Sequence, residues 1–445
     1  MKTPIIDFVR DYADKNIVRL HMPGHKGISR LGFEALDITE IEGADVLYSP
    51  SSIILESENN ASRLFGTGHT YYSTEGSSLC IKAMLALASK GQKNTSVLAA
   101  RNVHKAFVYA CALLDIDVDW LYPESESHLC ACNITPSVLD AALRSLDSLP
   151  CAVYVTSPDY LGNILDIAGL AEVCHAYKIP LLVDNAHGAY LNFLSESKHP
   201  IALGADMCCD SAHKTLPVLT GGAYLHISKE ADKYCESARE RLSLFASTSP
   251  SYLILQSLDA CNLYIEDGYA DSLCSFCAEL DILKASLADA GYKICDTEPL
   301  KLVIDACASG MSGKDIDIGL RERGVEIEFS DDCFAVMMLT PENSGDIERL
   351  HAALLDIYSS SDKSERENTI GDFGIRSSKR VMSIREATLS ESEIISVSEA
   401  KGRICASVCV SCPPAVPIVV SGELIEARHI KEFEYYKTKE ISVVK

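Results

Sequence analysis

Two short stretches decide the fold class: LLVDNAH at 181–187 and DSAHKTLP at 210–217. The first is an apolar run that ends in Asp184, and the second carries Lys214 in a Ser-x-His-Lys segment. A lysine amine can form a Schiff base with the aldehyde of pyridoxal phosphate, and a buried carboxylate can pair with the protonated ring nitrogen of that cofactor. Most lysines are simply solvated charges, so the interpretation depends on both stretches occurring together. They predict an enzyme of amino-acid chemistry that uses pyridoxal phosphate.

The residues around these stretches alternate short apolar strands with helical segments from about residue 66 to 225. Strands separated by helices predict an α/β fold with a largely parallel sheet and ligands at the carboxyl ends of its strands. We expect strands at 69–73, 96–100, 118–121, 152–156, 180–184 and 207–209, and a further one at 221–226.

The pattern changes along the chain and predicts several parts. We expect an N-terminal segment at 1–65, a cofactor-binding large domain at 66–264, a smaller α+β domain at 265–358 and a C-terminal unit at 369–445. The polar, charged residues 359–368 indicate a linker. Within the C-terminal unit we expect a helix at 390–402.

Composition excludes several classes of function. The formal net charge of −23 argues against nucleic acid or an anionic membrane surface as a partner, since both require a basic surface. No apolar run approaches the roughly 20 residues of a membrane span, and the first ten residues include Asp7 and lack the long apolar core of a secretory signal. The sequence therefore predicts a cytoplasmic protein with a small-molecule substrate.

The cysteines lie mostly inside apolar runs, where a reduced thiol behaves as a small hydrophobic group. Cys405, Cys409 and Cys412 have a spacing that iron–sulfur clusters also use. Because Cys405 and Cys409 fit one face of an Ala/Val-rich helix, we expect packed thiols here and no metal site.

Two further segments suit the cofactor. Glu75-Gly76-Ser77-Ser78 lies between a strand and a helix, where free helical amides and two hydroxyls can bind a phosphate dianion; ordinary helix capping is the alternative. Ser211 offers one more hydroxyl. His104 follows the strand at 96–100 and can stack on a cofactor ring or transfer a proton, although a structural histidine is the alternative. For Asp184 the alternative is a helix N-cap.

Together these segments resemble the fold-type-I ornithine/lysine/arginine decarboxylase family, in its shorter bacterial form. HMPGHKG at 21–27 resembles the opening motif of that family, and the likeness extends through STSPSY at 247–252 to the proline-rich C-terminal segment. The resemblance therefore covers most of the chain. It implies fold type I of the pyridoxal-phosphate-dependent transferases, with a mostly parallel large-domain sheet, a smaller α+β domain and a short C-terminal unit.

The resemblance also implies roles for individual residues. His104 would stack on the cofactor ring, Asp184 would pair with the ring nitrogen, and Ala186 would lie against the ring face. The cofactor-binding residues expected are Gly76, Ser77, Ser78, His104, Asp184, Ala186, His187, Ser211, His213 and Lys214, and of these Lys214, His104 and Asp184 are expected to be catalytic.

The expected reaction is α-decarboxylation of arginine, lysine or ornithine to the corresponding amine, feeding polyamine synthesis. Two alternatives stay open at this point: an aminotransferase, for which Arg321 or Arg323 would have to clamp the substrate carboxylate, and a non-catalytic cofactor-binding paralogue.

Two departures from the family pattern matter. The sequence has no N-terminal wing domain of the kind that assembles long family members into decamers, so we expect a homodimer or a dimer-based oligomer. SGE at 421–423 stands where Pro-Gly-Glu is usual, which leaves the choice of basic amino acid open.

Overall fold

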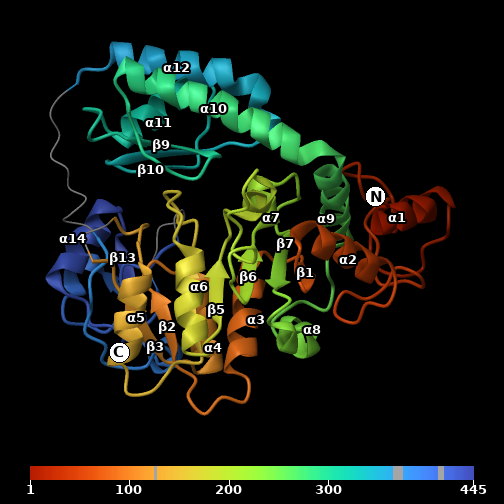
Figure 1. Ribbon diagram of the computed structural model, residues 1–445, viewed down its shortest axis with the longest axis horizontal. Helices are drawn as coiled ribbons and strands as arrows, with labels where there is room; N and C mark the ends of the chain where they lie inside the picture. Colours follow the sequence, from red (N-terminus) through yellow and green to blue (C-terminus); the bar gives the residue numbers. More distant parts are fainter. Residues whose placement is uncertain (125–127, 364–373, 409–414) are drawn as a thin grey trace. The chain divides into compact units, whose positions relative to one another are not determined.

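The computed structural model describes residues 1–124, 128–363, 374–408 and 415–445 (Figure 1). Their contacts form two compact units, one made of 1–92 with 174–271 and the other of 93–173 with 272–445. Two helices carry the chain from one unit to the other: α6 (Ile167–Ala176) and α10 (Ala270–Ala290).

The first unit contains four strands in the order β1-β7-β6-β5. β5 and β6 are parallel, whereas β7 is antiparallel to both β6 and β1. The elements are α1 (Pro4–Asp14), α2 (Ile53–Phe65), β1 (His69–Ser73), α3 (Ser77–Ser89), β5 (Leu181–Asp184), β6 (Met207–Asp210), α7 (Ala212–Thr215), β7 (Ala223–Ile227), α8 (Cys235–Ser243) and α9 (Tyr252–Tyr264).

Burial explains why these strands read as continuous apolar runs. Every residue of β5, β6 and β7 is buried, as expected for strands covered on both faces. α3 begins directly after Gly76, whose φ of +70° lies in the left-handed region that glycine adopts without strain. The turn between β1 and α3 therefore requires glycine at this position.

The second unit contains three parallel strands in the order β4-β2-β3. The strands expected at 69–73, 118–121 and 152–156 are confirmed at those residues, and the others differ by one or two residues at their ends. The expectation of a mostly parallel sheet is confirmed, since β7 is the strand that runs antiparallel to its neighbours. The elements are β2 (Val97–Ala100), α4 (Lys105–Leu114), β3 (Val118–Leu121), α5 (Pro136–Ser145) and β4 (Ala152–Thr156).

A smaller α+β layer follows in the same unit, with an antiparallel sheet in the order β10-β11-β9-β8. Figure 1 shows α10 and α12 side by side over this sheet, and Ser286 of α10 hydrogen-bonds His351 of α12 at 2.9 Å. The elements are β8 (Lys293–Ile294), β9 (Lys301–Asp305), α11 (Gly313–Glu322), β10 (Phe329–Ser330), β11 (Phe334–Met338) and α12 (Ile347–Ser360).

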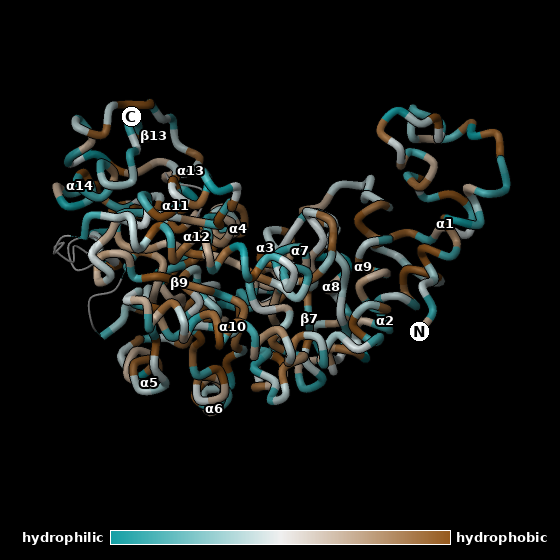
Figure 2. The backbone as a smooth tube through the Cα atoms, turned by 90° about the horizontal axis from the view of Figure 1, so that it is seen from above, coloured by the Kyte–Doolittle hydropathy of each residue, from teal (hydrophilic) through white to brown (hydrophobic). Residues whose placement is uncertain are grey.

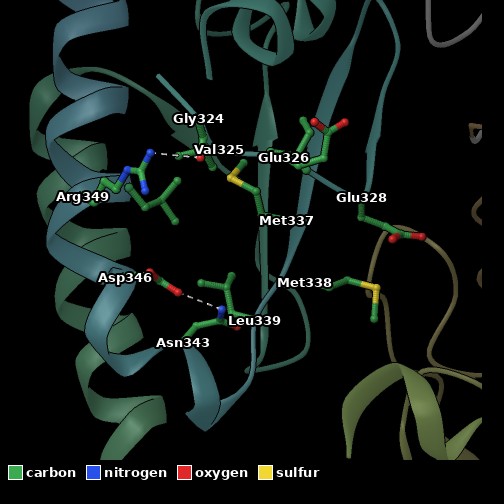
Figure 3. A pocket seen from close by; sticks show the side chains of 12 residues that line it. Gly324, Val325, Glu326, Glu328, Met337, Met338, Leu339, Asn343, Asp346 and Arg349 are labelled. Atoms are coloured by element: carbon green, nitrogen blue, oxygen red, sulfur yellow. Dashed lines mark hydrogen bonds between the residues drawn. The ribbon is translucent and has the colours of Figure 1, made fainter. Parts of the chain in front are cut away.

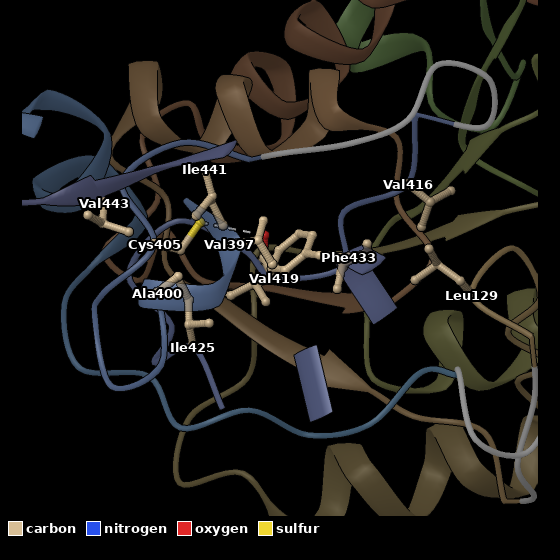
Figure 4. Close-up of a cluster of buried hydrophobic side chains, with 11 residues drawn as sticks. Leu129, Val397, Ala400, Cys405, Val416, Val419, Ile425, Phe433, Ile441 and Val443 are labelled. Atoms are coloured by element: carbon tan, nitrogen blue, oxygen red, sulfur yellow. Dashed lines mark hydrogen bonds between the residues drawn. The ribbon is translucent and has the colours of Figure 1, made fainter. Parts of the chain in front are cut away.

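The C-terminal part of this unit has a core of its own (Figure 4). Phe433 and Val419 are fully buried there, together with Ile441 and Val443 of β13. Leu129, from the segment between β3 and α5, belongs to the same cluster, so the C-terminal residues pack against a large-domain segment of their own unit. The elements are α13 (Ile384–Leu389), β12 (Ser392–Ser396), α14 (Ala427–Tyr435) and β13 (Glu440–Val444).

The prediction of a helix at 390–402 is wrong. Ser392–Ser396 forms β12, which pairs antiparallel with β13, and a short 3₁₀ turn follows at Val397–Glu399. Pairing with a strand almost fifty residues later, visible only in the fold, overrides the local pattern. Cys405 is buried beside β13 rather than on a helix, while Cys409 and Cys412 lie outside the described residues. Among the described residues, no helix is both long and apolar enough to cross a membrane.

One buried carboxyl in this core gives a prediction about pH. Burial, opposed by the charges of Arg101, Arg428 and Arg376, raises the pKa of Glu432 to about 7. A folded-state pKa above the unfolded value of about 4.3 means that stability falls as pH rises between those two values. Glu432→Gln should therefore raise the free energy of unfolding by roughly 3 kcal/mol at pH 8 and change it little at pH 4.

Urea unfolding at both pH values measures this effect. Glu434→Gln, on the exposed face of the same helix, is the matched control and should show no such pH dependence. Equal stability of the Glu432→Gln and parent chains at pH 8 would contradict the prediction.

Candidate active site

Two hydroxyls and a helix terminus meet where β1 and β6 lead into helices of the first unit. Ser211 donates to the hydroxyl of Ser77 at 2.8 Å, and the amide of Gly76 donates to the carbonyl of Gly221 at 2.7 Å. No described side chain caps the N-terminus of α3, so the amides of its first turn point into this corner without a capping partner. Ser78 lies in that first turn. The arrangement suits a phosphate group.

Glu75 ties this corner to a second loop. Its Oε1 accepts a hydrogen bond of 2.6 Å from the amide of Ser247, the first residue of the STSPSY segment. A single carboxylate thus joins two segments that the sequence analysis had linked only through family resemblance. Sequence position alone gave no sign of this contact.

Lys214 lies in the short helix α7, three residues after Ser211. Its Nζ is 2.9 Å from Nε2 of His187, so the amine and the imidazole share a hydrogen bond. His187 comes from the segment that follows β5. The segments 181–187 and 210–217 are therefore brought together by the pairing of β5 with β6.

Asp184 ends β5 and is 2% exposed. Its Oδ1 accepts from the amide of Ala186 at 3.3 Å and lies 3.5 Å from the thiol of Cys209. Both contacts hold the carboxylate at the strand end. A buried carboxylate at a strand end is a suitable partner for a cationic ring nitrogen.

A second buried carboxylate lies next to it in the fold. Asp210 ends β6, is fully buried, and accepts hydrogen bonds from Nε2 of His199 at 3.0 Å and Nε2 of His226 at 3.1 Å. Its other oxygen accepts from the side-chain amide of Asn185 at 2.7 Å. Burial alone would raise the pKa of Asp210, but the two histidines outweigh burial and hold that pKa well below its ordinary value.

Cys208 lies at the edge of this cluster, with its sulfur 3.9 Å from Nε2 of His199. The contacts to Asp210 have the length of ordinary hydrogen bonds. We therefore interpret the cluster as a hydrogen-bonded buried anion that fixes Asn185, the residue directly after Asp184.

The two remaining histidines of the prediction have defined surroundings. His213 donates through Nδ1 to the carbonyl of Gly222 at 2.9 Å, and burial lowers its pKa. His104 belongs to the second unit, where it caps α4 by accepting the amide of Ala106 at 3.1 Å. The structure thus groups the predicted residues of the first unit, and the place of His104 beside the cofactor stays a prediction.

A hollow of about 390 Å³ lies elsewhere, in the small α+β layer between β11 and α12 (Figure 3). Its polar groups are already engaged: Arg349 donates to the carbonyl of Gly324 at 3.1 Å, and Asn343 donates to Asp346 at 3.3 Å. None of the predicted site residues lines it. We therefore do not assign the chemistry to this hollow.

Family models match this chain in two parts. The model of the Orn/Lys/Arg decarboxylase major domain matches residues 3–285, and that of the C-terminal domain matches residues 377–442. The chain belongs to the Orn/Lys/Arg decarboxylase family. It is therefore a pyridoxal-phosphate-dependent decarboxylase, and the fold class predicted from the sequence is confirmed.

Individual relatives of this decarboxylase extend over most of the chain. An arginine decarboxylase of Bacillus subtilis (strain 168) is 30% identical over an alignment of 467 residues, which covers 96% of this chain and 92% of that protein. Among solved structures, a Francisella novicida lysine decarboxylase has a TM-score of 0.82 at 15% identity and covers 100% of this chain and 81% of its own. The Escherichia coli constitutive lysine decarboxylase has a TM-score of 0.79 at 16% identity, with 100% and 82% covered. At such low identity the solved structures show the fold.

The residues of the first unit fit pyridoxal phosphate. The uncapped start of α3 with Ser77 and Ser211 suits the phosphate, the amine of Lys214 suits the aldehyde, and the buried carboxylate of Asp184 suits the ring nitrogen. The residues thus match the phosphate, the aldehyde and the ring nitrogen of the cofactor. We propose that these residues hold it.

The cluster around Asp210 could not be predicted from the sequence. Asn185, His199, Asp210 and His226 were not singled out, although Asp210 ends a buried strand just as Asp184 does. The place of Asp210 at the end of a strand was the one sequence feature that could have indicated the cluster. No sequence feature indicated His199 and His226, because they lie near Asp210 only in the folded chain.

The cluster predicts the effect of one substitution. Asp210→Asn places an amide where three donors converge on an anion, so it should lower the free energy of unfolding by about 3 kcal/mol and weaken cofactor affinity through Asn185. Urea unfolding and equilibrium dialysis with pyridoxal phosphate measure the two effects.

Asp206→Asn is the control for this substitution. Asp206 also accepts from one histidine and one backbone amide, but its histidine partner is half-exposed, so the loss should be much smaller. An Asp210→Asn chain as stable as the parent would show that the buried carboxylate is not held as an anion.

Proposed function

We propose that the enzyme removes the α-carboxylate of a basic amino acid, with arginine as the first candidate, and that the amine formed feeds polyamine synthesis. The observation that carries this proposal is the contact of Lys214 with His187 beside Asp184, in a chain that resembles an arginine decarboxylase over nearly its whole length. Pyridoxal phosphate supplies the electron sink for the pair left when the carboxylate departs.

The residues of the site divide this work. Asp184 holds the proton on the cofactor ring nitrogen, because an ionised carboxylate in a buried position favours a cationic partner. Lys214 would hold the cofactor through its amine. By the family resemblance, His104 and Ala186 would contact the ring.

Proton transfer at Lys214 needs a partner, and His187 is placed to act as one. Nε2 of His187 can take a proton from Nζ of Lys214 when the amine must be a nucleophile, and can return it when Lys214 protonates the substrate carbon. The hydrogen bond of 2.9 Å is short enough for direct transfer.

The contacts of two arginines count against an aminotransferase. Arg321 forms ion pairs with Asp317 at 3.1 Å and Glu326 at 2.9 Å. Arg323 binds Asp356 through Nε at 3.0 Å. Both guanidinium groups are thus engaged by neighbours at the end of α11, and neither is reserved for a substrate carboxylate.

We further propose that the enzyme is a homodimer or a dimer-based oligomer. Figure 2 shows hydrophobic, brown stretches of the backbone near α1 and α2. The segment between these two helices exposes a run of apolar side chains, of which Val18 is 80%, Leu20 90% and Leu31 76% exposed. Met22 and Ile28 belong to the same run. Several large apolar side chains left in water on one short segment are typical of an interface, and a second copy of the chain would cover them.

The substrate proposal is tested by competition. The parent chain, loaded with cofactor and incubated with equal arginine, lysine and ornithine, should release CO₂ and mainly agmatine. Lys214→Ala should lose turnover by at least about a thousandfold, because the group that holds the cofactor and moves protons is gone. Cadaverine or putrescine as the main product would reassign the substrate, and no CO₂ from any of the three would contradict the proposal.

A substitution in the exposed apolar segment between α1 and α2 tests the proposed dimer. Leu20→Glu places a charge in the expected interface and should shift sedimentation from dimer to monomer at micromolar concentration. Ile282→Glu on α10 changes an isolated apolar residue that is 72% exposed, and it should leave the mass unchanged. A Leu20→Glu chain that keeps the parent's mass would show that this segment lies outside the interface.

A further inference from the structure

The C-terminal segment 415–423 is hydrogen-bonded to the loop that carries His104. Both segments belong to the second unit. Arg101, the first residue after β2, donates through Nη1 to the carbonyl of Pro417 at 2.9 Å and through Nη2 to that of Ile418 at 3.1 Å. The same Nη2 lies 3.3 Å from Oε2 of Glu423. One arginine side chain therefore binds three groups of this segment.

A second attachment lies on the other side of His104. The amide of Lys105 donates to the carbonyl of Ala415 at 3.0 Å. His104 itself is fixed to the first turn of α4, because its Nδ1 accepts the amide of Ala106. The histidine is thus bracketed by two contacts with one C-terminal segment, from Arg101 before it and from Lys105 after it.

The C-terminal end of α4 is held by another residue of the C-terminal part of the chain. Arg385 of α13 donates through Nη1 to the carbonyls of Ala112 and Leu113, both at 3.1 Å. These carbonyls belong to the last turn, where a cation is favourable. The helix that begins beside His104 is therefore fixed at both ends by C-terminal residues.

The contact between Arg101 and Glu423 is a buried ion pair. Arg101 and Glu423 are each 2% exposed, and Oε2 of Glu423 also accepts the amide of Val420 at 2.8 Å. A buried charge that loses its partner is strongly destabilised, so each member restricts where the other can lie. The Arg101 guanidinium also stacks on Trp120, at 5.2 Å from the ring centre.

We propose that Arg101 and Glu423 are positioning residues that set His104 against the cofactor ring. The proposal rests on the role given above to His104 and extends it to the C-terminal unit. Ser421, where the sequence departs from the family pattern, leaves this pair intact because Glu423 is retained. The C-terminal unit thereby contributes to cofactor binding without touching the cofactor.

The test is a double-mutant cycle in cofactor affinity. His104→Ala should weaken pyridoxal phosphate binding by about fivefold, the worth of one ring contact. Glu423→Gln, which keeps the shape and removes the charge, should weaken it by about threefold in the parent but cause no further change in the His104→Ala background. Equal weakening by Glu423→Gln in both backgrounds overturns the proposal. So does a His104→Ala chain that binds the cofactor as tightly as the parent.

Glu298→Gln is the matched control. Glu298 forms an ion pair with Lys301 at 2.7 Å, both are 1% exposed, and both lie in the second unit away from the His104 loop. Its effect on affinity should be the same with and without His104. Glu298→Gln could instead weaken cofactor binding in the parent and have no effect in the His104→Ala background. The coupling would then not be specific to the Arg101–Glu423 pair, and the proposal fails.

Trp120 gives a readout that needs neither substrate nor cofactor. It is the single tryptophan of the chain, so a shift of its emission in Glu423→Gln reports that Arg101 has moved, while Glu298→Gln should leave the emission unchanged. If Glu423→Gln does not fold, Glu423→Asp keeps the charge on a shorter side chain and enters the same cycle. Because affinity is measured without an amino acid, a failed decarboxylation assay leaves this test intact.

Discussion

The parallel pairing of β5 with β6 is the constraint on which the site depends. Its register sets Leu182 opposite Met207 and Asp184 opposite Cys209. A slip by one residue would turn every side chain of β5 to the other face of the sheet and take Asp184 out of the site. The same register brings Asn185 to Asp210 and His187 to Lys214, so ring-nitrogen partner, proton partner and cofactor lysine are all set by a single strand pair.

Two carboxylates at adjacent strand ends pose an electrostatic problem, and the structure separates them by their donors. Asp210 has three strong donors and is satisfied within the protein. Asp184 accepts from the amide of Ala186 at 3.3 Å and lies 3.5 Å from the thiol of Cys209. Like charges in a buried site repel strongly unless each has its own compensation. The difference between the two residues therefore lies in their surroundings, since their position on the strand is the same.

Local sequence was enough to predict the strands, because each is short and its signal is contiguous. β1, β3 and β4 lie at the bounds predicted for them, and Asp184 and Ser77 lie at the ends of a strand and a helix, whereas Lys214 lies within α7. That these residues bind the cofactor stays a prediction. Contacts between distant segments could not be predicted. The histidines around Asp210, the pairing of β12 with β13 and the Arg101–Glu423 pair each join residues whose closeness depends on the fold alone.

Burial of the thiols near the site has a consequence for redox chemistry. Cys80, Cys208 and Cys209 are fully buried, and burial raises the pKa of each well above its ordinary value. A thiol that stays protonated and out of reach of solvent is a poor nucleophile and a poor target for oxidants. The exposed Cys274 on α10 lies outside this group. Oxidative damage to the enzyme would therefore begin at the surface, and the cysteines beside the cofactor lysine would be the last to react.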